Sequence, residues 1–217
     1  LIDFQIVIRV LPNLNDILNG VVDFKDFKKI NINDLVRKKI NFINNNTINN
    51  QLENSSVLVT GAGGSIGSEL CRQLVQFKIT RIILLDHSEA NLYKINSDLI
   101  EIIKDNKVEI IPILCSVLDT KTIKYHLPKL KPEFVFHAAA YKHVPLLEGN
   151  IVEAIKNNFL GTLNILNLAI EVKCKRFLLI STDKAVRPTN VMGATKRLSE
   201  MLMQAYAEIQ NNTIISI

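Results

Sequence analysis

A cluster of glycines directly after a short β-branched run constrains this chain more than any other feature. Four of its eight glycines fall within seven residues, at positions 61, 63, 64 and 67. They follow the run Val57–Thr60 and precede Ser65–Phe77, where apolar residues recur at helical spacing. A strand that turns through glycine into a helix lets a phosphate approach the backbone and the free amides of the helix N-terminus. The pattern therefore predicts a pyrophosphate cradle made of Gly61, Gly63, Gly64, Ser65, Ile66 and Gly67.

An acidic residue at the end of the next predicted strand gives the glycine cluster its context. Asp86 ends the apolar run Arg81–Asp86 and lies 19 residues beyond Gly67. This is close to the spacing of about 20 at which an acid binds the adenosine ribose of a dinucleotide. A carboxylate there repels the 2′-phosphate of NADP, so the cofactor we expect is NAD. The rival interpretation is a structural glycine turn with an aspartate that only caps the following helix.

Short apolar runs alternate with helical patterns over residues 55–217. These runs are apolar on both faces, which is typical of a parallel sheet covered by helices on both sides. The expected fold class is therefore α/β, a Rossmann-type doubly wound parallel sheet that is truncated at the C-terminus. We expect strands at 57–60, 81–86, 108–114, 134–137, 176–181 and from 213, and helices at 65–77, 89–103, 120–127, 151–172 and 191–209.

The first 54 residues differ in character from the remainder. They contain no glycine cluster, and their last part, residues 41–54, is rich in asparagine. We interpret residues 1–54 as the tail of a preceding region plus a linker, and residues 55–217 as an incomplete NAD-binding Rossmann domain. The chain begins with Leu1, and its last residues read as a strand that stops, so we expect it to be a piece of a longer polypeptide.

Charge and cysteine content exclude several other classes of protein. The net charge is +5, but the basic residues are scattered, which argues against a nucleic-acid partner. The three cysteines are far apart and form no metal-ligand pattern with the four histidines, so we expect no metal site and reduced thiols in a cytosolic compartment. No apolar run approaches the roughly 20 residues that a membrane span needs.

Four longer stretches carry a family resemblance. They read TGAGGSIGSEL at 60–70, FHAAAYKHVPLL at 136–147, AIKNNFLGT at 154–162 and ISTDKAVRPTNVMGATKR at 180–197. Together they resemble the nucleotide-sugar 4,6-dehydratases of the extended short-chain dehydrogenase/reductase (SDR) family. The subgroup they resemble is the long, membrane-anchored one that acts on UDP-N-acetylglucosamine (UDP-GlcNAc) in polysaccharide and bacillosamine biosynthesis. Residues 7–40 also resemble the tail of the region that precedes the catalytic domain in that subgroup.

The resemblance implies a redox-neutral elimination of water from a UDP-sugar. NAD takes hydride from C4, the resulting ketone acidifies the C5 proton, the C6 hydroxyl leaves as water, and hydride returns to C6. It also implies a parent protein that is anchored in the inner membrane, with its catalytic domain on the cytoplasmic side, and that forms a homo-oligomer at full length. By itself, the 217-residue piece should be soluble and inactive.

Family analogy places the reaction's acid and base just after the fifth expected strand. It makes Asp183 the acid that protonates the departing C6 oxygen and Lys184 the base at C5. For these roles burial must raise the pKa of the aspartate and lower that of the lysine, while their mutual attraction opposes both shifts. The rival interpretation is an ordinary surface turn.

A second catalytic pair is implied on the last helix. Met192 and Lys196 are four residues apart, where most of the wider family has tyrosine and lysine. A thioether cannot take a proton, so Thr182 or Asp183, with a water, becomes the group that deprotonates the C4 hydroxyl. Lys196 is expected to bind the nicotinamide ribose.

The remaining predicted contacts follow the fourth strand and lie on the long helix. The small side chains of Ala138, Ala139 and Ala140 would let the cofactor lie against the sheet edge, although an alanine run can also simply begin a helix. Lys142 and His143 are assigned to the substrate, with a solvated loop as the alternative. Asn158 is also assigned to the substrate, with a structural hydrogen bond as its alternative.

Three other functions remain open at this point. A nucleotide-sugar 4-epimerase needs no Asp-Lys pair after the strand, and a dehydratase that also inverts C5 would keep tyrosine at position 192. From a different class, the chain could be an NAD-binding regulatory module without turnover, which the intact pair Asp183-Lys184 argues against.

Overall fold

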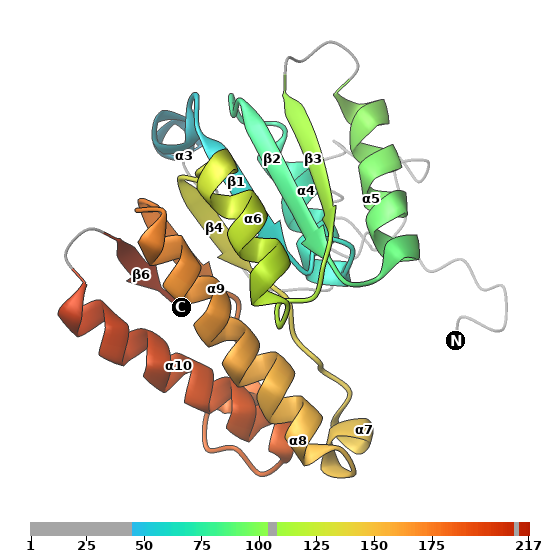
Figure 1. Ribbon diagram of the computed structural model, residues 1–217, viewed down its shortest axis with the longest axis vertical. Coiled ribbons are helices and arrows are strands. Elements are labelled where there is room, and N and C mark those ends of the chain that lie inside the picture. Colours follow the sequence, from blue (N-terminus) through green and yellow to red (C-terminus); the bar gives the residue numbers. More distant parts are fainter. Residues whose placement is uncertain (1–44, 104–107, 211–212) are drawn as a thin grey trace, which may run out of the picture. The chain divides into compact units, whose positions relative to one another are not determined.

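Six parallel strands form one sheet in the computed structural model, which describes residues 45–103, 108–210 and 213–217. The order across the sheet is β3-β2-β1-β4-β5-β6, so the direction of strand addition reverses between β1 and β4 (Figure 1). Ligands of open α/β sheets bind at the carboxyl ends of the strands at such a reversal. The strands are β1 (Ser56–Thr60), β2 (Arg81–Asp86), β3 (Glu109–Leu114), β4 (Phe134–His137), β5 (Arg176–Leu179) and β6 (Ile214–Ser216).

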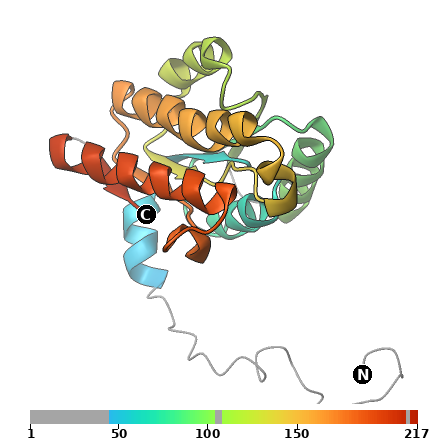
Figure 2. The same ribbon diagram turned by 90° about the horizontal axis from the view of Figure 1, so that it is seen from below.

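Helices connect the strands and cover both faces of the sheet (Figure 2). This arrangement confirms the predicted fold class. The helical segments are α3 (Asn45–Leu52), α4 (Ser65–Leu74), α5 (Glu89–Ile102), α6 (Thr120–Leu130), α7 (Val144–Glu148), α8 (Ile151–Ala154), the π-helix η3 (Ile155–Leu160), α9 (Gly161–Glu171), the 3₁₀ turn η4 (Asp183–Ala185) and α10 (Val191–Ile209).

The strand pleat explains why there are two cores. Along β1, Val57 and Val59 face a cluster that includes buried residues of α4 and α5. Leu58 points the other way, into a cluster built with α6, α9 and α10. Because neighbouring side chains on a strand point to opposite faces, a strand that is apolar at every position needs cover on both sides.

The long helix predicted over residues 151–172 is present, but it is not uniform. Its middle is the π-helix η3, between α8 and α9. Within it, the carbonyl of Asn158 accepts hydrogen bonds from the hydroxyls of Thr162 (2.6 Å) and Ser199 (2.9 Å). Short π segments inside α-helices often mark functional sites. Apolar spacing alone could not reveal it, because one of the two hydroxyls comes from α10.

The asparagine-rich segment, which we interpreted as a linker, contains a helix. In α3, Leu52 is 5% exposed and Ile48, one turn earlier, packs against the same core cluster. The Ser55 hydroxyl donates to the Leu52 carbonyl at 2.6 Å and fixes the exit from this helix. Residues 1–44 lie outside the described residues, so the prediction that they end a preceding region stays a prediction.

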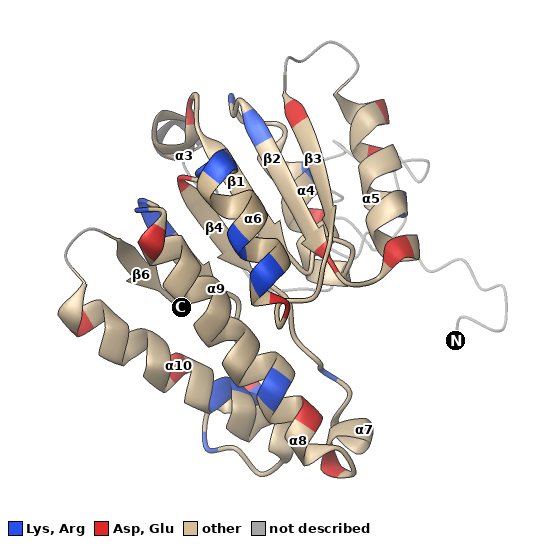
Figure 3. Ribbon diagram, in the orientation of Figure 1, with Lys and Arg blue, Asp and Glu red and all other residues tan. Residues whose placement is uncertain are grey.

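Basic and acidic residues are interspersed along the described part of the ribbon (Figure 3). Among the helices that the structure describes, none is both long enough and apolar enough to cross a bilayer.

Candidate active site

The glycine turn leaves the backbone open where β1 meets α4. Gly61 has a φ of +65°, and a Cβ added to it would lie 2.7 Å from the Cα of Ala139, so only glycine fits there. Gly64 precedes α4 and has no side chain with which to cap it. The amides of the first turn of α4 therefore have no side-chain acceptor at the cap, as an anion site requires.

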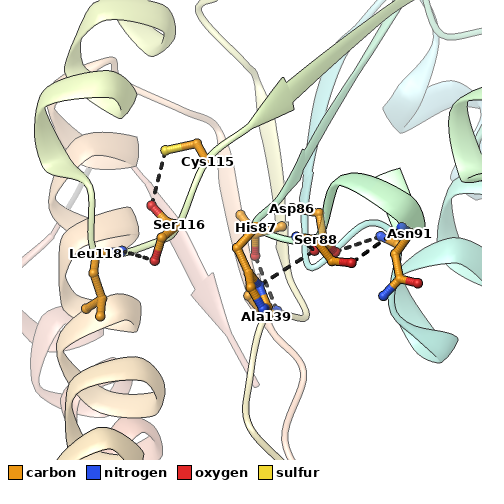
Figure 4. Close-up of polar contacts among 10 residues, drawn as sticks. Asp86, His87, Ser88, Asn91, Cys115, Ser116, Leu118 and Ala139 are labelled. Atoms are coloured by element: carbon orange, nitrogen blue, oxygen red, sulfur yellow. Dashed lines mark hydrogen bonds and ion pairs between the residues drawn. The ribbon is translucent and has the colours of Figure 1, made fainter. Parts of the chain in front are cut away.

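Asp86 joins the end of β2 to this turn. Its side chain is almost buried, with Oδ2 accepting from the Gly63 amide and Oδ1 from the Ser88 amide, both at 2.9 Å (Figure 4). Each carboxylate oxygen has two lone pairs, so each can still accept a hydroxyl from a ligand. The carboxylate is therefore held in a fixed position by the chain itself.

Two adjoining cavities open at the carboxyl edge of the sheet. The smaller, of about 130 Å³, brings together Gly61, Gly64 and Asp86 with the alanines that follow β4. The larger, of about 640 Å³, adds Gly63, Ser65, Lys142 and His143. Five residues line both cavities: Gly64, His87, Asn91, Ala140 and Tyr141.

Several lining residues were not predicted. Cys115 and Val117 follow β3, and Asn157 lies on η3. The rule that sites gather at the carboxyl ends of parallel strands could have found the first two. His87 and Tyr141 face each other with ring centroids 6.3 Å apart, a contact between distant segments that no local pattern signals.

The residues present fit a dinucleotide. Gly61 packs against the Ala139 backbone too closely for any side chain and lines the smaller cavity, and Ala138 to Ala140 line the same cavity with small side chains. Asp86 is anchored next to both. Such a set could hold the pyrophosphate at the amides of α4 and the ribose hydroxyls at Asp86.

The turn after β5 is more exposed than its predicted role requires. The Thr182 hydroxyl donates to Asp183 Oδ1 at 2.9 Å, and Lys184 Nζ lies 3.8 Å from the same oxygen. The Asp183 side chain is 89% exposed. The Thr182 hydrogen bond and the Lys184 charge lower the pKa of Asp183. The expected partial burial, which would keep a proton on this carboxyl, is therefore not provided by the described residues.

The two catalytic residues predicted on α10 have different surroundings. Lys196 is 5% exposed and donates from Nζ to the Ile180 carbonyl at 2.6 Å, and burial lowers its pKa to about 8. Met192 packs in an apolar cluster with Leu147 and Ala154. Neither residue lines the two cavities, so the contacts predicted for them stay predictions.

Asn158 is buried and lines neither of the two cavities. It is 1% exposed, its Oδ1 accepts from the Tyr141 amide at 2.8 Å, and its Nδ2 donates to the Tyr141 carbonyl and the Thr195 hydroxyl, both at 3.0 Å. With both ends of its amide engaged, the side chain positions the loop that carries Tyr141. The alternative of a structural hydrogen bond is therefore the better assignment.

A buried histidine connects the glycine turn with the long helix. His137 Nδ1 lies 2.7 Å from the Thr60 hydroxyl, and Nε2 lies 3.0 Å from the Thr162 hydroxyl. Burial, helped by the charge of Lys196, lowers the pKa of His137 to about 3. The ring is thus neutral near pH 7 and can donate through one nitrogen while it accepts through the other.

Comparison with known proteins agrees with this geometry. The family described as polysaccharide biosynthesis protein matches residues 57–217. The capsular polysaccharide biosynthesis protein CapD of Staphylococcus aureus is 44% identical over 203 residues, which are 94% of this chain and 34% of that protein. A UDP-N-acetylglucosamine 4,6-dehydratase (inverting) of Campylobacter jejuni is 33% identical over 158 residues, or 72% of this chain and 45% of that protein.

A solved structure extends the comparison to three dimensions. The chain superposes on Pen from Bacillus thuringiensis with a TM-score of 0.67 and 30% identity, over 76% of this chain and 51% of that one. The chain thus spans about a third to a half of the length of these proteins. It belongs to the polysaccharide biosynthesis protein family and, with its parallel sheet and glycine turn, to the extended SDR proteins related to nucleotide-sugar dehydratases.

Proposed function

We propose that the protein carrying this chain is an NAD-dependent UDP-GlcNAc 4,6-dehydratase of surface polysaccharide biosynthesis. One observation carries the proposal. The smaller cavity lies at the carboxyl edge of the sheet, and the turn Thr182-Asp183-Lys184 follows β5 at that same edge. A cofactor site and an acid–base pair at one edge are what an elimination assisted by transient oxidation needs. The chain would supply the cofactor half and this turn.

Asp86 supports NAD as the cofactor. Its carboxylate is fixed by two amides and has free lone pairs, so it can accept both ribose hydroxyls while repelling a 2′-phosphate. When bound, NAD would take hydride from C4 of the sugar and return it to C6.

The protein's own residues would move the protons. Lys184 is the proposed base at C5 and Asp183 the proposed acid at the C6 oxygen. Since Asp183 is exposed and its pKa is lowered, the acid role needs cover from the substrate and from parts of the protein beyond these residues. Met192 lies in an apolar cluster, which leaves Thr182 or Asp183, with a water, for the C4 hydroxyl.

The larger cavity is the proposed place for the UDP-sugar. Lys142 and His143 line it and are exposed, so they can meet the diphosphate or the sugar. Its volume of about 640 Å³ lies in the range of small-molecule sites, roughly 300–1,000 Å³. As for the parent protein, we expect membrane anchoring and a homo-oligomer.

Inversion at C5 is a second outcome of the same chemistry, because the Campylobacter jejuni relative is named as inverting. A proton returned to the opposite face of C5 would give that product. The two outcomes differ only in the stereochemistry at C5, which nuclear Overhauser contacts of H5 resolve for product formed in ordinary water.

An NMR time course tests the proposal. The full-length protein is incubated with UDP-GlcNAc and NAD in deuterated water, and ¹H spectra are followed. We expect a UDP-4-keto-6-deoxy sugar with deuterium at C5, and no product from the 217-residue chain alone. A 4-epimer, or no product from the full-length protein, would contradict the proposal.

A further inference from the structure

Helix α10 forms hydrogen bonds with two consecutive residues directly after β5. Lys196 Nζ donates to the carbonyl of Ile180 at 2.6 Å. One turn later on the same face, Glu200 Oε1 accepts from the hydroxyl of Ser181, also at 2.6 Å. A hydroxyl that donates to a carboxylate at this distance forms a strong, charge-assisted hydrogen bond.

A third contact on this face reaches the turn that follows. A Cβ on Gly193 would lie 2.3 Å from the carbonyl oxygen of Lys184, so the turn packs directly on the backbone of α10. Residues 193, 196 and 200 follow helical spacing and form one stripe. This stripe contacts Ile180, Ser181 and Lys184 and thus brackets Thr182 and Asp183.

The two oxygens of Glu200 face different surroundings. Oε1 accepts from Ser181, while Oε2 accepts from Nη1 of Arg197 at 3.0 Å. The Glu200 side chain is 13% exposed and that of Arg197 is 45% exposed. The contact with Ser181 is therefore the inner one, and the ion pair with Arg197 is at the surface, where such pairs contribute little to stability.

We propose that Glu200 is a positioning residue, which holds the turn 182–184 through Ser181 and whose charge stabilises the ammonium of Lys196. The role of the turn rests on the proposed function, but the two structural effects do not. Glu200 touches neither cavity, so it acts only through Ser181 and Lys196.

The surroundings of Lys196 make Glu200 the principal charge acting on it. Burial lowers the pKa of Lys196 to about 8, and Glu200 opposes that shift. His137 on β4 is neutral near pH 7. The charged groups on the turn and helices that pack against α10 in the described part of the chain are all exposed and thus well solvated: Glu148, Glu153, Lys156, Glu171, Asp183 and Lys184.

Two substitutions separate the two effects. Glu200→Gln removes the charge but keeps an oxygen that can accept from Ser181. Ser181→Ala removes the hydrogen bond but keeps the charge. Arg197→Gln is the matched control, because it removes only the exposed partner of the other oxygen.

The pKa of Lys196 is measured by ¹³C NMR of labelled lysine side chains in the 217-residue chain, with the signal assigned by Lys196→Arg. We expect Glu200→Gln to lower this pKa by about one unit. Ser181→Ala and Arg197→Gln should change it by less than about 0.3 units. An unchanged pKa in Glu200→Gln would overturn the electrostatic half of the proposal.

Amide hydrogen exchange of residues 182–185 tests the positioning half. Ser181→Ala should speed it at least about threefold, with Arg197→Gln at the wild-type rate. Equal rates in all three proteins would overturn this half. If Glu200→Gln does not fold, Glu200→Asp keeps the charge on a shorter side chain, so exchange should rise while the Lys196 pKa stays near its wild-type value.

Activity of the full-length protein gives a separate readout. Ser181→Ala should lower kcat about tenfold and leave KM unchanged, because the turn is loosened but substrate contacts are kept. An equal loss in Arg197→Gln would contradict a specific role for Ser181. If wild-type protein forms no product, the proposed function fails, while the titration and exchange results still decide the role of Glu200.

Discussion

Asp86 ends one strand of the parallel sheet and Asp183 follows another, yet the two acids are held in opposite ways. Asp86 is 5% exposed and accepts two backbone amides at 2.9 Å. The Asp183 side chain is 89% exposed and contacts only its sequence neighbours Thr182 and Lys184 among the described residues. The proposed cofactor end of the site is thus fixed by the chain itself, and the proposed acid–base end is not.

The difference reflects what each role demands. A ribose-binding carboxylate must be charged and fixed, which two nearby amides accomplish. A general acid must keep its proton near neutral pH, which needs removal from water. The contacts of Asp183 lower its pKa, so the described residues by themselves favour its charged form.

The largest expected effect comes from the exposed end. In the full-length protein, Asp183→Asn should lower kcat about 100- to 10,000-fold, because the acid is lost, and leave NAD affinity unchanged. Glu208→Gln, an exposed acid near the end of α10, is the control. Steady-state kinetics with UDP-GlcNAc measure the effect, and a kcat within a factor of two of wild type would remove Asp183 from the mechanism.

At the proposed cofactor end, Gly61→Ala should weaken NAD binding about 30- to 100-fold. The alanine would have to adopt a φ of +65° with its Cβ 2.7 Å from the Ala139 backbone. Calorimetric titration of the 217-residue chain with NAD measures the loss. Gly149→Ala is the control, since a Cβ added there would lie 3.9 Å from the Leu146 carbonyl oxygen, an ordinary van der Waals contact. An alanine at 61 that binds NAD as tightly as wild type would refute the cradle.

Behind the cofactor end, His137 predicts a loss of stability in acid. In the folded state the pKa of His137 is about 3, below the usual 6.5. Below pH 6.5 the imidazole is therefore protonated in the unfolded state and neutral in the folded state. The free energy of unfolding should therefore fall by about 1.6 kcal/mol between pH 6.5 and 5. Urea unfolding measures it, and His137→Gln should lose that part of the slope. The same slope in both proteins would show that the ring is protonated in the fold.

The smallest effect is expected from Asp86→Asn, which keeps the shape of the side chain and removes its charge. NAD affinity should fall about tenfold, because charge-assisted hydrogen bonds to the ribose weaken. The ratio of NADP to NAD affinity should rise. Titrations with both cofactors measure this, with Asp98→Asn, which pairs with Arg72 away from the cavities, as the control. An unchanged ratio would mean that Asp86 does not select the cofactor.

Local patterns predicted the secondary structure of the proposed cofactor end. The strand before Gly61, the helix after it and the position of Asp86 are all encoded within about 30 consecutive residues. Runs that are apolar at every position likewise predicted the parallel sheet, because a strand covered on both faces buries side chains on both faces.

Features that depend on distant contacts were not predictable in this way. The π segment around Asn158 involves the hydroxyl of Ser199 on α10. Helix α3 places Leu52 in a core cluster that is otherwise built from residues later in the chain. The low exposure of Asn158 and the high exposure of Asp183 follow from packing between elements, which no single stretch of sequence records. The pairing of Ser181 with Glu200 also joins a strand end to a helix.

Calorimetric titration of the 217-residue chain with NAD and with NADP tests most directly whether the cofactor end is complete. We predict that NAD binds at a single site and that NADP binds at least about tenfold more weakly, because the fixed Asp86 carboxylate repels a 2′-phosphate. No binding of NAD, or tighter binding of NADP, would contradict the account.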